Sequence, residues 1–113
     1  MSSQIQHHER NQMPLTVLMS MPITPGLTHE IIDEVLRHDL PHTASYPGNE
    51  VTEVIRAEEN SDILVLLTKW STCEAYEAYS AWRRTPEGAT RMAEIVSGPP
   101  TFQRFSSYMT FTS

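Results

Sequence analysis

The feature that most constrains the fold is an apolar segment that ends in a tryptophan, "ILVLLTKW" at residues 63–70. Side chains of a β-strand alternate between the two faces of a sheet. The segment therefore has two apolar rows, Ile63, Val65 and Leu67 on one face and Leu64, Leu66 and Trp70 on the other. Contiguous exposed apolar patches of this size are uncommon on monomers. We expect helices to cover one row, and either a pocket or a two-fold partner to cover the other.

Other segments carry the signals of three further strands and of helices. Alternating apolar residues predict strands, and apolar residues three or four positions apart predict helices. The expected elements are a strand at 15–23, a helix at 27–38, strands at 51–57 and 63–70, a helix that begins after Trp70 and is broken before a second part at 85–96, and a strand at 102–111. This order predicts an α+β fold, a ferredoxin-like split βαβ domain whose four-stranded antiparallel sheet has helices on one face.

Local signals mark where the helices begin and end. Pro41 is expected to end the first helix and to open a loop that continues to the next strand. Ser71 and Glu74 have the spacing of a capping box, in which the serine hydroxyl accepts from the backbone amide three residues later. Thr85 precedes Pro86, an N-cap residue followed by proline in the first helical position. We therefore expect helix starts at both places.

Length and composition restrict the class of protein. The 113 residues are one domain, which we place at 13–113 after a flexible polar tail at 1–12. A formal net charge of −6 argues against sequence-independent binding of nucleic acid. A single cysteine, Cys73, excludes a disulfide framework within the chain and a cysteine-based zinc site. With no long apolar run or basic amphipathic segment, we expect a soluble cytoplasmic protein that does not bind membranes.

Three aromatic residues recur at three-residue steps after the apolar strand, Tyr76, Tyr79 and Trp82. They fall on one face of the expected helix. Such a stripe is often part of a hydrophobic core that joins a helix to a sheet. Two tyrosine hydroxyls need partners when buried, however, and a wall of amphipathic rings also suits a flat phenolic ligand. Both interpretations remain open for these residues and for Trp70.

The element order and two segments, "VLLTKWSTCEAYEAY" and "PPTFQRFSSY", resemble the antibiotic biosynthesis monooxygenase domain. The resemblance covers roughly residues 14–111. It implies membership of the dimeric α/β-barrel superfamily, in which two ferredoxin-like sheets pair in a homodimer and a pocket lies between each sheet and its helices. Members include cofactor-independent oxygenases of aromatic polyketide pathways, haem-degrading enzymes and polyketide cyclases.

The resemblance also implies roles for particular residues. The family's tryptophan at the end of the third strand matches Trp70, and an aromatic residue in the following helix matches Tyr76. An arginine that helps to hold the oxygenated intermediate matches Arg91. The polyketide oxygenases carry an asparagine where this chain has Leu66, so an apolar group replaces an amide. The axial histidine of the haem-degrading branch would fall near Ser80, and no histidine follows His42.

A short segment, "HDLPH" at 38–42, contains two candidate proton acceptors, His38 and His42. Because Pro41 is expected to prevent the helical spacing that makes such pairs chelating, we expect no metal site here. Histidine has a reference pKa of about 6.5, which suits proton abstraction from a phenol.

Taken with the resemblance, these residues favour a cofactor-free monooxygenase that acts on a phenol or hydroquinone in aromatic secondary metabolism. Trp70, Arg91, His38 and His42 are then the candidate catalytic residues, and Leu66, Tyr76, Tyr79 and Trp82 the candidate substrate-binding residues. A polyketide cyclase or isomerase that uses the same pocket is the alternative. A non-catalytic dimer that binds a small molecule is the third hypothesis.

Overall fold

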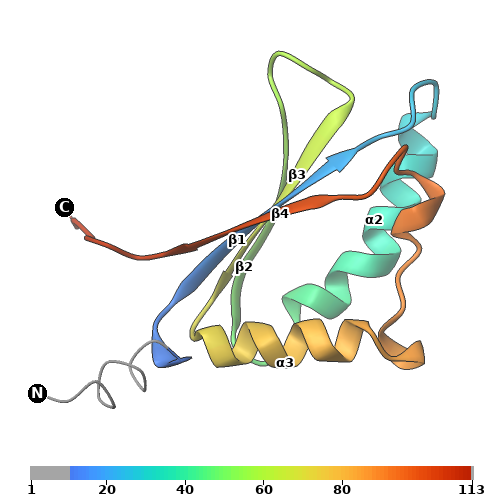
Figure 1. Cartoon of the computed structure of the whole chain (residues 1–113). Helices are drawn as coiled ribbons and strands as arrows, with labels where there is room; N and C mark the ends of the chain where they lie inside the picture. The colour runs from blue at the N-terminus through green and yellow to red at the C-terminus, as the bar shows by residue number, and fades with distance from the viewer. Residues whose placement is uncertain (1–10, 113) are drawn as a thin grey trace, which may run out of the picture.

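A computed structural model describes residues 11–112. The expected tail at 1–12 therefore lies almost entirely outside the described residues. The elements are β1 (Leu15–Pro22), α2 (His29–Ala44), β2 (Asn49–Arg56), β3 (Ile63–Trp70), α3 (Cys73–Arg83), two 3₁₀ turns, η1 (Pro86–Gly88) and η2 (Met92–Glu94), and β4 (Thr101–Ser106). Figure 1 shows both helices on one side of the sheet, as the sequence predicts.

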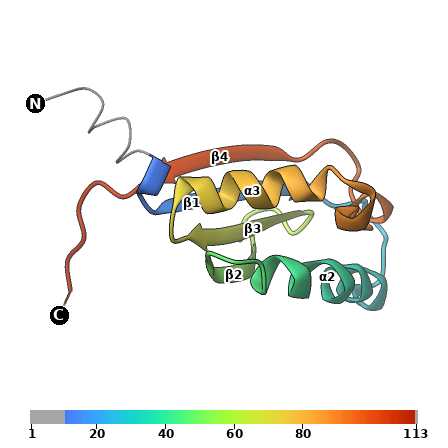
Figure 2. The same ribbon diagram turned by 90° about the horizontal axis from the view of Figure 1, so that it is seen from below.

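The four strands form one antiparallel sheet in the order β2-β3-β1-β4. This is the ferredoxin-like order, and it confirms the predicted fold class. The central pair is β1 and β3, which align Leu15 with Trp70 and Met21 with Leu64. Seen from below, α3 lies beside β1 and β4, whereas α2 lies beside β2 and β3 (Figure 2).

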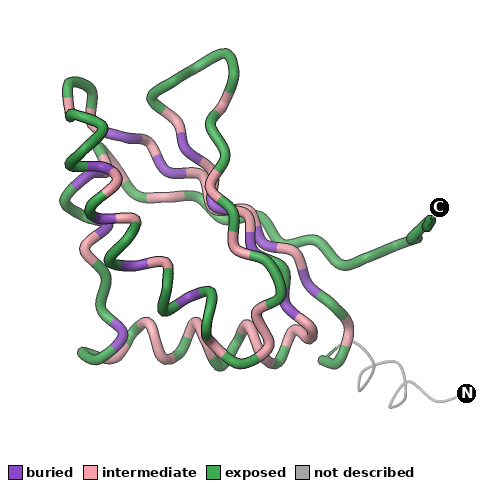
Figure 3. The backbone as a smooth tube through the Cα atoms, turned by 180° about the vertical axis from the view of Figure 1, so that it is seen from behind, coloured by how far each residue is buried: buried purple, intermediate pink, exposed green. Residues whose placement is uncertain are grey.

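The two rows of β3 face different surroundings. Leu64, Leu66 and Trp70 are buried at 4%, 7% and 0% exposure and face the helices. Ile63, Val65 and Leu67 are only partly buried and face away from them. Figure 3 shows the buried positions concentrated in the central strands and along the inner side of α2. Within the described residues, the outer face of the sheet is therefore uncovered.

The helix-side core divides into two clusters along β1 and β3. One lies under α2 and η2 and includes Met21, Val35 and Ile95. The other lies under α3 and centres on Trp70, with Leu15 and Val17 beside it. Together they hold the two helices at different places on the sheet and leave room between them.

The expected end of the first helix at Pro41 is wrong, because α2 continues to Ala44. A proline inside a helix removes one backbone hydrogen bond and costs about 3 kcal/mol. The last turn is tied from outside instead, since Arg83 donates to the Asp39 carbonyl at 2.8 Å and to Thr43 Oγ1 at 2.8 Å. These tertiary contacts offset the proline, and His38 and His42 consequently lie in a helix rather than in a loop.

Other boundaries also differ from the sequence-based expectation. The N-cap of α3 is Thr72, whose Oγ1 accepts from Ala75 N at 3.0 Å, whereas the Ser71 amide bonds to Gly48. The predicted helix at 85–96 is reduced to η1 and η2. Thr85 does cap η1, but the Arg91 N–H donates to the Asp39 carboxylate and not to a helical carbonyl.

The last strand is shorter than the predicted segment 102–111. It pairs with β1 until Ser106 lies opposite Leu15, the first residue of β1. No strand partner remains beyond that point among the described residues, so residues 107–112 leave the sheet. Figure 1 shows this segment running away from the body of the domain.

Candidate ligand-binding site

A cavity of about 240 Å³ lies in the room between the two helices and the sheet. Its sheet side is mostly apolar and consists of Val17, Met19, Leu66, Thr68 and Phe102. Its helix side consists of Asp39, Leu40 and Thr43 from α2, Tyr76, Tyr79, Ser80 and Arg83 from α3, and Thr90 and Met92 from the segment after α3. The volume is just below the range of about 300–1,000 Å³ that is typical of ligand pockets. The cavity thus has an apolar floor and a polar rim.

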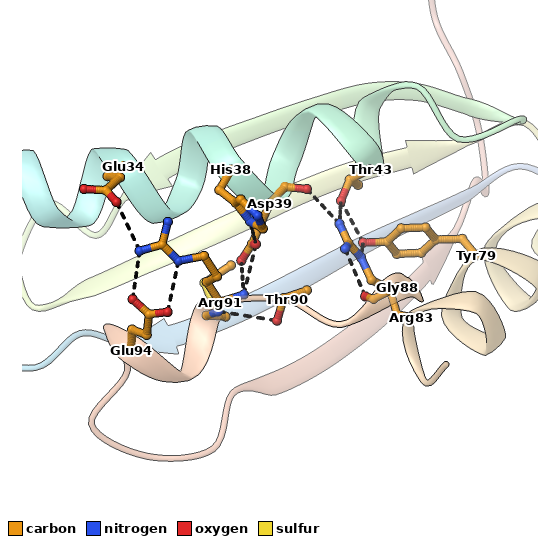
Figure 4. Close-up of polar contacts among 11 residues, drawn as sticks. Glu34, His38, Asp39, Thr43, Tyr79, Arg83, Gly88, Thr90, Arg91 and Glu94 are labelled. Carbon is orange, nitrogen blue, oxygen red and sulfur yellow. Dashed lines mark hydrogen bonds and ion pairs between the residues drawn. The ribbon is translucent and has the colours of Figure 1, made fainter. Parts of the chain in front are cut away.

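Arg83 is the only cation among the lining residues described here. Its Nε donates to the Tyr79 hydroxyl at 2.8 Å, and its Nη1 donates to the Gly88 carbonyl at 3.1 Å. Its Nη2 donates to the Asp39 carbonyl and to Thr43 Oγ1, both at 2.8 Å. The planar guanidinium makes such a fork of donors in a fixed geometry. Arg83 therefore joins the end of α3 to the last turn of α2, as Figure 4 shows.

The hydroxyls of Tyr79 and Thr43 form a pair within this cluster. Their oxygens are 2.7 Å apart, and Arg83 donates to both. Each of the two hydroxyls has one hydrogen, and the hydrogen bond between the hydroxyls uses one of these two hydrogens. The other has no acceptor among the described residues. One hydroxyl donor is therefore left for a ligand.

Trp70 lies behind the cavity wall and does not line it. Its side chain is fully buried, and its Nε1 donates to Thr68 Oγ1 at 2.9 Å. Thr68 does line the cavity. Trp70 thus orients a lining residue while it fills the core below α3.

Asp39 is a carboxylate with 1% exposure, and it connects the cavity rim to the surface. Both of its oxygens accept the Arg91 backbone N–H, at 3.0 and 3.1 Å. Its Oδ1 also lies 2.8 Å from Nδ1 of His38, whose side chain is 50% exposed. A buried carboxylate without such partners would be costly. Asp39 therefore fixes the segment before η2 and contacts a histidine that reaches solvent.

The side chain of Arg91 lies outside the cavity. Its guanidinium pairs with Glu34 at 3.1 Å and with Glu94 at 2.9 Å on the surface between α2 and η2. Hydrogen bonding to Glu94 and then to Glu34 raises the pKa of Arg91, and the bond from Arg91 lowers the pKa of Glu94. Figure 4 shows the Arg91 guanidinium between Glu34 and Glu94 on one side of Asp39, and the Arg83 guanidinium beside Thr43 on the other.

The structure brings together some of the predicted site residues and separates others. Leu66, Tyr76 and Tyr79 line the cavity. Trp82 and His42 pack against each other beyond it, with ring centroids 6.3 Å apart. His38 meets the site only through Asp39, and neither histidine is a lining residue.

The site residues predicted from the sequence do not include Arg83, Asp39 or the hydroxyl residues Thr43 and Thr68. Arg83 follows Tyr79 by four residues on α3, so the helical period alone places the two side chains on one face. That signal was available in the sequence. The role of Asp39 was hidden because a helix that ends at Pro41 would leave the residue in a loop.

The described cavity wall contains no histidine or cysteine. Ser80, where the haem-degrading branch was expected to carry an axial histidine, is a lining residue. The cavity thus offers haem iron neither an imidazole nor a thiolate ligand. Within residues 11–112, no three His, Cys, Asp or Glu side chains are grouped as a metal site. No helix of that part of the chain is long and apolar enough to cross a membrane.

The fold and the cavity define a small α+β domain with a ligand-sized space between one sheet face and its helices. The family model of the antibiotic biosynthesis monooxygenases matches residues 14–94. The chain belongs to this family. No curated protein matches the chain.

Several solved structures share the fold at low sequence identity. SnoaB, a cofactor-independent oxygenase from Streptomyces nogalater, is 13% identical with a TM-score of 0.69 and covers 89% of this chain and 99% of its own. The heme-degrading protein Rv3592 from Mycobacterium tuberculosis is 14% identical with a TM-score of 0.66, over 91% and 100% of the two chains. A conserved protein from Methanosarcina mazei Go1 is 14% identical with a TM-score of 0.68, over 87% and 96%. These likenesses establish the fold alone.

Tyr76 gives a pH-dependent test of the cavity wall. Burial raises the pKa of its hydroxyl above the ordinary value of about 10, although Arg104, whose guanidinium lies over the ring at 5.2 Å, lowers it. A raised pKa means that the folded protein favours the neutral phenol. The raised pKa of Tyr76 adds to the free energy of unfolding. This contribution is complete below about pH 10 and is lost as the pH rises through the folded-state pKa. We expect Tyr76→Phe to lose less stability than the wild type over that alkaline range.

The measurement is ultraviolet titration of the tyrosines together with urea unfolding at each pH. The wild-type curve minus the Tyr76→Phe curve should have its midpoint above pH 10. A difference curve centred at or below pH 10 would show that Tyr76 is solvated and that this wall of the cavity is open.

Proposed function

We propose that the chain is an enzyme that oxidises a phenol or hydroquinone-type aromatic substrate with O₂ in this cavity, without a bound cofactor. The observation that carries the proposal is the pairing of an apolar floor with a cluster of Arg83, Tyr79 and Thr43 at one end. Such a site can hold a flat ring system and direct one of its oxygens to hydrogen-bond donors. Family membership supports the reaction class.

In this mechanism the substrate supplies the electrons. Removal of a proton gives an electron-rich phenolate or enolate that reacts with O₂. For an anthrone-type substrate, a CH₂ group becomes C=O and the second oxygen atom leaves in water with the two hydrogens. The protein orients the ring, excludes water and stabilises negative charge on the substrate oxygen. Arg83 replaces Arg91 in our proposal as the group that faces this charge, because the carboxylates of Glu34 and Glu94 neutralise Arg91.

The proposed proton route uses Asp39 and His38. Asp39 is the one carboxylate among the described lining residues, and its Oδ1 is 2.8 Å from His38 Nδ1. A proton taken from the substrate by Asp39 can therefore pass to His38 and then to solvent. His38 thus keeps a role in proton transfer in our proposal. It receives the proton from Asp39 and does not contact the substrate directly.

The alternative, a polyketide cyclase or isomerase, draws support from one residue. Leu66 is buried and lines the cavity where the related oxygenases were expected to present an amide. An apolar group there suits reactions that move protons without binding oxygen. A non-catalytic binding protein is the third outcome, and oxygen consumption separates the three.

Oxygen uptake with an anthrone-type phenol is the direct test. We expect the purified protein to consume one O₂ for each quinone formed. Arg83→Gln should lower kcat/KM by about tenfold or more, because it removes a charged donor from the developing oxyanion. Arg91→Gln, which loses only surface ion pairs, should retain the wild-type rate. Isomerised product without oxygen uptake would favour the cyclase, and tight binding without turnover would favour the binding protein.

His38 and His42 offer a matched comparison for the proton route. Both lie on α2 with exposed side chains, but only His38 contacts Asp39. We expect His38→Gln to lower kcat, because it removes the imidazole that would take the proton from Asp39. His42→Gln should leave kcat unchanged. Equal effects of the two substitutions would contradict a route through Asp39.

A homodimer is also part of the proposal. The outer face of the sheet carries apolar side chains from all four strands, which include Leu18, Ile55, Val65, Leu67 and Phe105. They lie on the face opposite the helices, and a second copy placed sheet to sheet would cover them.

We expect the wild type to sediment as a dimer of the 12.9 kDa chain at micromolar concentration. Leu67→Glu should dissociate it, since a carboxylate would be buried at the interface. Arg37→Glu, on the exposed surface of α2, should not. A stable wild-type species of 12.9 kDa would contradict this arrangement.

A further inference from the structure

The guanidinium of Arg83 has no anionic partner, in contrast to two other arginines near the site. Arg91 pairs with Glu34 and Glu94, and Arg104 pairs with Glu77 at 2.8 Å. Within residues 11–112, no carboxylate lies within ion-pair distance of Arg83. All four of its acceptors are neutral oxygens, two carbonyls and two hydroxyls. Arg83 therefore forms no ion pair at the polar end of the cavity, where the Asp39 carboxylate is the one anionic lining residue among those described.

The nearby carboxylate of Asp39 forms no ion pair with Arg83. Asp39 contributes only its backbone carbonyl to Arg83. Its carboxylate accepts the Arg91 N–H and lies beside His38, and Figure 4 shows it directed toward that side. Neutral acceptors satisfy the hydrogen bonds of a guanidinium, but they do not cancel its charge.

The donors that remain match one oxyanion. A guanidinium has five N–H donors, and the four hydrogen bonds of Arg83 leave one donor on Nη1. The pair formed by Tyr79 and Thr43 leaves one hydroxyl hydrogen. Hydrogen bonds with an ionised acceptor are roughly twice as strong as those between neutral groups. A charged oxygen at this end of the cavity would accept from these donors and form an ion pair with Arg83.

We propose that the cavity selects aromatic ligands that already carry one negatively charged oxygen group, and that Arg83 is the residue that determines this selectivity. The inference rests on the proposed function only in placing the ligand in the same cavity. The inference concerns equilibrium binding of the ligand and does not depend on a reaction with O₂. The shared chemistry is the oxyanion, which a carboxylate or an ionised phenol can supply.

The test is equilibrium binding of two isosteric probes, 2-naphthoate and 2-naphthamide, measured by calorimetry without turnover. At pH 7 we expect the wild type to bind the carboxylate at least about tenfold more tightly than the amide. Arg83→Gln should reduce this ratio to about one, and Arg83→Lys, which keeps the charge, should retain a preference for the carboxylate. Arg91→Gln is the matched control and should keep the full ratio.

A third probe, 2-naphthol, separates the two sources of the oxyanion. If the site accepts an ionised phenol, its affinity should rise with pH while that of naphthoate stays level between pH 6 and 9. If only naphthoate binds tightly over this range, the ligand is a carboxylate.

Equal wild-type affinities for naphthoate and naphthamide would overturn the inference, as would a preference that survives in Arg83→Gln. Because Arg83 also ties α2 to α3, the melting temperature of each variant must be measured beside its affinity. If Arg83→Gln fails to fold, the ratio of naphthoate to naphthamide affinity in the wild type and in Arg83→Lys still tests the inference. A protein that consumes no oxygen but prefers naphthoate would refute the proposed reaction and leave the selectivity intact.

Discussion

The four hydrogen bonds of Arg83 are the interaction on which the rest of the structure depends. They join the end of α3 to the Asp39 carbonyl and the Thr43 hydroxyl in the last turns of α2, and to the Gly88 carbonyl in η1. Both helices lie on one face of a four-stranded sheet but over different strands, so the space between them must be closed by side chains from their ends. Arg83 closes it with polar contacts, which keeps a cavity where a larger apolar residue would complete the core.

Much of the fold was predictable from the sequence because strand patterns are local. The alternation and apolar character at Ile63–Trp70 gave that strand with its observed bounds. The errors arose where tertiary contacts override local preference. Pro41 lies inside α2 because Arg83 holds the last turns from outside through the Asp39 carbonyl and the Thr43 hydroxyl. The second part of the broken helix is replaced by 3₁₀ turns because the Asp39 carboxylate takes the Arg91 N–H. The pairings of Asp39 with Arg83 and with Arg91 join residues 44 and 52 positions apart, and no local pattern encodes them.

The candidate site was predictable to a smaller extent. The helical period placed Tyr76 and Tyr79 on one face, and both line the cavity, together with Leu66 from the strand. The same period does not tell which cation faces inward. Arg83 and Arg91 differ in their partners through the path of the chain between them. The charge that distinguishes them follows from Glu34 and Glu94, which neutralise Arg91 and leave Arg83 as the unpaired cation at the cavity.

The central claim is that Arg83, and not Arg91, meets the ligand. It is tested most directly by following the arginine Nε–H signals in a ¹H–¹⁵N correlation spectrum while 2-naphthoate is added to the wild-type protein. The account predicts a progressive shift of the Arg83 Nε–H, which donates to the Tyr79 hydroxyl in the free protein, and little change at Arg91. A shift at Arg91 with Arg83 unchanged would contradict it.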